Sequence, residues 1–140
     1  MRTLSSFVVA AAAAGTAACH DMAVFQPSLQ NVSGSYTARS FMTTASDSTI
    51  DWIARGATMT ITLTTDGATT GHLFVPGGAV GGGDLDADMA GRWLLVGTTV
   101  QFGQSADTFV RGIDFSASQN RLFADHTFAD GTEVRIVLMK

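Results

Sequence analysis

The sequence predicts an all-β fold, a small antiparallel up-and-down barrel of about eight strands that follows an N-terminal signal peptide. Apolar and polar residues alternate with a period of two along most of the chain after residue 33. Thr, Ser and Gly are abundant and Lys occurs once, a composition that suits short strands and tight turns better than helices. Turn pairs such as Asp66-Gly67 and Asp130-Gly131 separate the alternating runs at hairpin spacing. A meander of this length closes naturally into a barrel, which removes exposed strand edges.

The first 18 residues have the layout of a secretory signal. Arg2 precedes a short apolar stretch from Leu4 to Ala14 that is too short to span a bilayer. The next residues, Thr16-Ala17-Ala18-Cys19, resemble a bacterial lipobox, in which the cysteine is lipidated and becomes the mature N-terminus. Cys19 is the only cysteine, and lipidation would account for a lone exported thiol. The alternative is ordinary cleavage after Ala18, which leaves Cys19 free.

The lipobox resemblance carries an expectation about location. It implies membrane anchoring through lipidated Cys19, and His20 in place of Asp favours an outer-membrane lipoprotein that faces the periplasm of the bacterial cell envelope. Residues 19–32 then form a tether to the folded domain at 33–140. This tether either remains flexible and lets the domain stand off the bilayer, or docks one or two apolar residues on the barrel.

Several stretches of the folded part read as strands in chain order. The clearest is 57–65, where Met59, Ile61 and Leu63 alternate with threonines. The stretch 47–55 is ambiguous between a helical turn and a strand, and 77–83 is a glycine-rich loop without the ending of a phosphate-binding loop. The other expected strands are 33–42, 70–76, 84–90, the two arms of a hairpin within 89–102, 107–115, 121–128 and 132–139.

The same alternation predicts which side chains point into the barrel. Large apolar residues dominate this set, which favours a mostly filled interior with at most a shallow pocket at its mouth. The expected inward residues are Met59, Ile61, Leu63, Leu73, Val75, Trp93, Leu95, Val100, Phe102, Phe109, Ile113, Phe115, Leu122, Val134, Ile136 and Leu138.

Two short motifs, Gly34-Ser35-Tyr36 and Gly91-Arg92-Trp93, open strands with Gly-x-aromatic. On these motifs residues 33–140 resemble the bacterial lipocalin-like (calycin-type) lipoprotein domains. The resemblance implies a barrel that binds a small hydrophobic ligand or lipid. It also allows Arg121 or Arg135 to stack on Trp93, and the alternative is an ordinary buried Trp93 with solvent-exposed arginines. The side chains expected to contact the ligand are Tyr36, Trp93, Phe102, Phe109, Phe115 and Arg135.

The sequence gives little support for a metal site or for a catalytic site. Asp84, Asp86 and Asp88 lie on one face of an expected strand and are a weak candidate for a Ca²⁺ site, although a solvated outer face is the commoner role of such a run. His72 and His126 are far apart in sequence, and no Gly-x-Ser-x-Gly elbow occurs. We therefore expect no enzyme activity and no cofactor.

The net charge and the distribution of basic residues disfavour two further kinds of binding partner. The net charge is −4 and the basic residues form no cluster along the sequence, which argues against nucleic acid and against electrostatic attachment to anionic lipid. Two functions remain: an exported, lipid-anchored barrel that binds a small hydrophobic ligand, or a filled barrel that acts as a protein-interaction module without a ligand.

Overall fold

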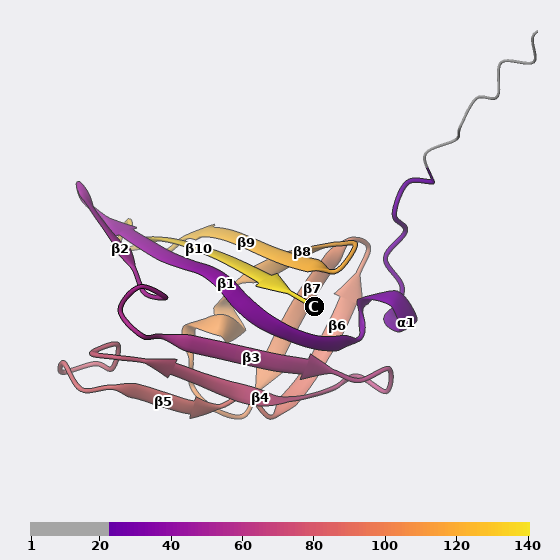
Figure 1. The fold of residues 1–140 in the computed structure, drawn as a ribbon, viewed down its shortest axis with the longest axis horizontal. Helices are drawn as coiled ribbons and strands as arrows, with labels where there is room; N and C mark the ends of the chain where they lie inside the picture. Colours follow the sequence, from indigo (N-terminus) through magenta and orange to yellow (C-terminus); the bar gives the residue numbers. More distant parts are fainter. Residues whose placement is uncertain (1–22) are drawn as a thin grey trace, which may run out of the picture.

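The computed structural model describes residues 23–140 and confirms the all-β prediction (Figure 1). The predicted signal peptide and Cys19 lie outside the described residues. One helical turn, α1 (Leu29–Val32), precedes the sheet, and a short 3-10 helix, η1 (Phe109–Gly112), interrupts it. The strands are β1 (Gly34–Ala45), β2 (Ser48–Asp51), β3 (Thr58–Leu63), β4 (Ala68–Val75), β5 (Leu85–Asp88), β6 (Gly91–Val96), β7 (Thr99–Gln104), β8 (Asp114–Ser118), β9 (Arg121–Thr127) and β10 (Glu133–Met139).

Eight of these strands form a closed antiparallel barrel in the order β1-β3-β4-β6-β7-β8-β9-β10, and pairing of β10 with β1 closes it. Each barrel strand neighbours the next one along the chain, so the up-and-down prediction is confirmed. The two additional strands extend this barrel: β2 pairs with the far half of β1, and β5 pairs with β4 beyond β6. The ambiguous stretch 47–55 is therefore β2 followed by a turn that holds Trp52.

The two ends of the barrel differ in the segments that they carry. The α1 end holds α1, the turns at 64–67, 97–98 and 119–120, and Lys140, and it is the end from which residues 23–28 depart (Figure 1). The opposite, η1 end holds the turn at 46–47, the loop at 76–84, residues 105–113 and the turn at 128–132.

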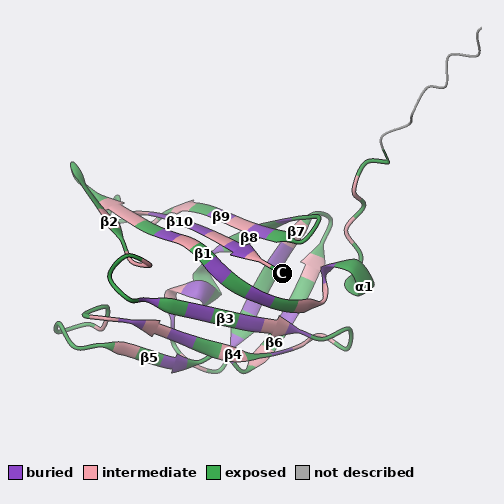
Figure 2. Ribbon diagram, viewed as in Figure 1, coloured by how far each residue is buried: buried purple, intermediate pink, exposed green. Residues whose placement is uncertain are grey.

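Large apolar side chains fill the interior, and buried residues alternate with exposed ones along the barrel strands (Figure 2). All of the expected inward residues are buried except Leu95 and Phe109, which are half-buried. The list of expected inward residues omits some core residues, of which Tyr36, Phe41 and Met89 are the largest. The interior is thus packed with side chains, as the residue sizes predicted.

Each Gly-x-aromatic motif has a separate structural reason. A Cβ at Gly91 would lie 2.5 Å from Gln104 Cα and 2.5 Å from Gly103 O, so only glycine lets β6 approach β7 this closely. Gly34 has a φ of +140°, and the ring of Tyr36 that follows lies 5.4 Å from Lys140 Nζ. The Tyr36 hydroxyl donates to Val32 O over 2.6 Å, which joins β1 to α1.

The segment before the barrel docks on it, one of the two arrangements left open from the sequence. Ser28 and Asn31 form a capping box around α1, Val32 is buried, and Phe25 packs against the core. The tether expected over 19–32 is therefore held on the barrel from Phe25 onward. Within residues 23–140, no helix has the length and apolar character needed to cross a membrane.

Candidate functional site

The pairing between β7 and β8 covers only half of β7. Strand β7 pairs with β6 at all of its six residues, but with β8 only at Thr99, Val100 and Gln101. Beyond Gln101, no residue of β8 pairs with β7, which leaves a gap in the wall. A strand over 107–115 was predicted here, and η1 lies in its place. That prediction was wrong for 107–113, because Phe109 to Gly112 coil into a 3-10 turn and β8 begins only at Asp114.

The turn that covers this gap is loosely bonded. The Arg111 amide reaches Thr108 O over 3.3 Å and the Ile113 amide reaches Val110 O over 3.5 Å, both at the long end for such bonds. Within residues 23–140 the N-cap Thr108 makes no side-chain capping bond. A wall segment with few and long backbone bonds is the part of a barrel that opens most easily.

Two buried polar side chains flank this gap, Gln104 at the end of β7 and Thr108 at the N-cap of η1. Gln104 is 3% exposed and Thr108 7% exposed, and neither the Gln104 amide atoms nor the Thr108 hydroxyl has a hydrogen-bond partner within the described residues. Leaving such a group unpaired costs about 1–3 kcal/mol, so a buried unpaired amide calls for a specific explanation. A water or a polar group of a ligand at this place would supply the missing bonds.

Aromatic rings lie on the strands that border the gap and at the η1 end. Phe102, two residues before Gln104 on the same face of β7, meets Phe115 edge to face with ring centroids 5.2 Å apart. Phe109 lies 5.5 Å from the Phe41 ring, and Phe41 lies 6.2 Å from Trp52. The η1 end thus carries a rim of half-buried Trp52 and Phe109 around buried Phe41, and within residues 23–140 the gap is flanked by one unpaired amide and one unpaired hydroxyl.

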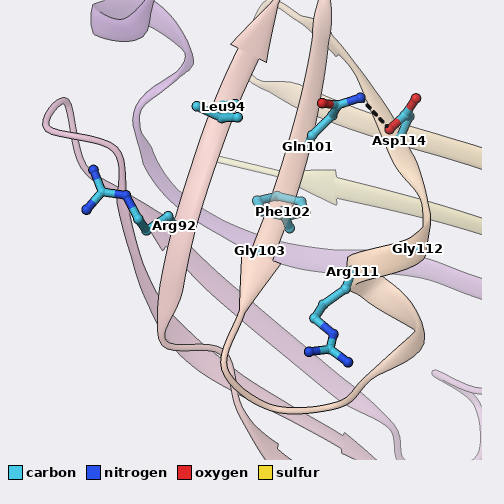
Figure 3. A pocket seen from close by; sticks show the side chains of 8 residues that line it. All are labelled: Arg92, Leu94, Gln101, Phe102, Gly103, Arg111, Gly112 and Asp114. Atoms are coloured by element: carbon cyan, nitrogen blue, oxygen red, sulfur yellow. Dashed lines mark hydrogen bonds between the residues drawn. The ribbon is translucent and has the colours of Figure 1, made fainter.

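The outer face of the gap is a surface hollow of about 390 Å³ (Figure 3). Most polar side chains of this hollow already have partners within the protein. Gln101 Nε2 donates to Asp114 Oδ1 over 3.2 Å, and Arg111 pairs with Asp107. Arg92 points away from Arg111. The two arginines therefore do not converge on one anion. The hollow is lined by Arg92, Leu94, Gln101, Phe102, Gly103, Arg111, Gly112 and Asp114.

The predicted ligand residues divide into three groups. Phe102 and Phe115 come together beside the gap, and Phe109 lies on η1 against Phe41. Tyr36 and Trp93 are buried at the α1 side with structural bonds: Trp93 Nε1 donates to Thr64 O over 2.8 Å, and burial raises the pKa of Tyr36 to about 12.

Arg135, the sixth predicted ligand residue, lies on the outer face of β10. Its guanidinium pairs with Asp125 over 3.1 Å, and Arg121 lies over the Phe123 ring instead. Of the two alternatives for Trp93, the structure therefore shows the buried ring with solvent-exposed arginines, because both arginine side chains point outward in the alternation. Sequence reasoning also missed Gln104, whose only signal is that it shares the inward phase of Val100 and Phe102.

The three aspartates before Met89 have separate partners. Asp86 Oδ1 lies 2.7 Å from His72 Nε2, Asp84 accepts from the Gly77 amide, and Asp88 accepts from the Ala90 amide. In the part of the chain that the structure describes, no three His, Cys, Asp or Glu side chains gather closely enough to hold a metal ion.

Comparisons with known proteins identify no relative: no protein-family profile, no curated protein and no solved structure matches the chain. A function must therefore be argued from the geometry.

Proposed function

We propose that this protein is an exported, lipid-anchored β-barrel of the bacterial cell envelope that binds a small hydrophobic ligand carrying one hydrogen-bonding group. It acts as a binding protein and not as an enzyme. The observation that carries the proposal is the unpaired Gln104 amide, buried beside the Phe102–Phe115 pair under the loosely bonded η1 turn. Anchoring rests on the lipobox resemblance at Thr16–Cys19.

The ligand enters by displacing η1. Val110 is fully buried and Phe109 half-buried, so outward movement of this turn leaves apolar space against Phe102 and Phe115. The hydrocarbon part of the ligand fills that space, and its polar group bonds the Gln104 amide. The ligand thereby restores both the apolar contacts and the missing hydrogen bonds that an open η1 would lose.

Octanol and octanethiol test this arrangement, because they share a chain and differ in hydrogen-bonding strength. We expect saturable octanol binding, observed by calorimetry, about tenfold tighter than octanethiol binding, since one neutral hydrogen bond contributes about 1 kcal/mol or slightly more. Gln104→Leu should abolish this preference and retain chain binding. Equal binding of the two compounds by the wild type would refute the role of Gln104.

Gln101→Leu is the matched control, because Gln101 lies on the same strand and faces outward. It should leave the preference for octanol unchanged. If Gln101→Leu and not Gln104→Leu removes the preference, the ligand lies in the outer hollow instead of beneath η1.

The packed interior favours a second candidate, a filled barrel that serves as a protein-interaction module. Trp93, Tyr36 and Phe115 are among its fully buried side chains, and Val80 in the loop at 76–84 is fully exposed. Crosslinking from Val80 in intact cells should then capture an envelope protein, and the wild type should bind no octanol. A preference for octanol over octanethiol that is lost in Gln104→Leu would exclude this candidate.

A further inference from the structure

The α1 end of the barrel gathers most of the large apolar side chains that the described surface exposes. Leu94 and Val96 are 63% and 59% exposed on the outer face of β6, and Leu29 of α1 is 47% exposed. Leu29 and Leu94 line one hollow of about 350 Å³, and Val96 follows Leu94 on the same strand face. Val24 is exposed beside the turn at 119–120. Of the large exposed apolar residues, only Met42 and Val80 lie toward the other end.

The charged side chains divide between the same two ends. Although the basic residues form no cluster along the sequence, the fold brings Arg92, Arg121 and Lys140 to the α1 end. Asp66 is the one acidic side chain there among residues 23–140, and the other ten acidic side chains of this range lie on the barrel flank or at the η1 end. The α1 end is therefore both the apolar and the basic end of the domain.

The path of the chain toward Cys19 leaves from this end as well. Phe25 packs on the core and Ala23 lies at the turn around Asn120. The docked segment therefore adds little to the distance that the chain can reach from the barrel. Three residues, 20–22, then separate Ala23 from Cys19, and four residue steps of fully extended chain span at most about 14 Å. An acylated Cys19 would keep the α1 end within that distance of the bilayer.

From these three observations we infer that the α1 end docks on the bilayer surface, with Leu29, Leu94 and Val96 in contact with the headgroup–acyl boundary. The inference rests on the proposed acylation of Cys19. Apolar contacts and basic side chains near anionic headgroups act together in such interfacial binding. The acidic η1 end then faces away from the membrane.

The full-length acylated protein in vesicles of phosphatidylethanolamine and phosphatidylglycerol tests this orientation. Acylation leaves no native thiol free, so Val96→Cys places a single nitroxide label at the α1 end, and Val80→Cys is the matched control at the η1 end. We expect the label at 96 to be about fivefold less accessible than the label at 80 to a water-soluble relaxation agent. In the acylated protein without a cysteine substitution or label, amide hydrogen exchange should be slower at 92–99 on vesicles than in detergent. Exchange at 77–83 should be the same in both.

Two outcomes overturn the inference, and mass spectrometry of Cys19 separates them. Equal accessibility at 96 and 80, or unchanged exchange at 92–99, in protein with acylated Cys19 refutes docking and leaves the anchor in place. An unacylated Cys19 refutes the anchor of the proposed function, and the docking with it.

Discussion

Gly91→Ala is a substitution for which the structure predicts a large effect from a single added carbon. The new Cβ would lie 2.5 Å from Gln104 Cα and from Gly103 O, about an ångström inside normal contact distance. Both atoms belong to the backbone of β7, so no side-chain rotation relieves the clash, and β6 must move away from its partner. Overpacking of this kind costs about 1–3 kcal/mol, and weakening the adjacent Gly91–Gln104 pair adds about 1 kcal/mol.

Gly103→Ala is the matched control on the facing strand. Its Cβ would lie 3.9 Å from Arg92 O, the nearest atom among the described residues, and its backbone is not left-handed. Urea denaturation followed by circular dichroism should give a free energy of unfolding lower by about 2–4 kcal/mol for Gly91→Ala, and within about 0.5 kcal/mol of the wild type for Gly103→Ala. Equal stability of the two variants would show that β6 and β7 do not approach as described.

Three further predictions concern the buried bonds and the aspartates. Tyr36→Phe should lower the free energy of unfolding by about 1–2 kcal/mol at pH 8, because Val32 O loses its donor. Burial raises the Tyr36 pKa to about 12, so the unfolded chain ionises first and the wild type loses stability as pH rises from about 10 to 12. Denaturation at pH 8 and pH 11 should therefore show the gap between the two proteins narrowing, and a constant gap would contradict this. Trp93→Phe should cost about 1–3 kcal/mol in the same assay because Thr64 O is left without the indole donor, and an unchanged midpoint would count against that bond. Calorimetric titration with Ca²⁺ should show no heat for the wild type or Asp86→Ala, whereas heat lost only in the variant would establish a cation site.

Local alternation was enough to predict the barrel because it repeats in strand after strand. Met59, Ile61 and Leu63 must share a face in any extended chain, and their size and spacing leave the barrel interior as the place to bury them. The number of strands was less accessible. Whether Ser48–Asp51 pairs depends on the length of β1 beyond β3, and neither segment encodes that length locally.

The candidate site was predicted only in its apolar part. Phe102 and Phe115 obey the alternation, so their inward orientation followed from it. The η1 turn breaks the period and buries Val110 beside half-buried Phe109, an arrangement that depends on contacts with distant strands. Gln104 resembles an ordinary polar strand residue, since the lack of a partner for its amide is a property of the folded interior.

The most direct test of the proposed site is the side-chain amide resonance of Gln104 in ¹⁵N-labelled protein during an octanol titration. The proposal predicts a saturable shift of the Gln104 resonance at the same concentration that gives the calorimetric midpoint, with the resonance of Gln119 at the α1 end unchanged. A Gln104 resonance that does not move while octanol binds, or the absence of binding altogether, would contradict a ligand site under η1.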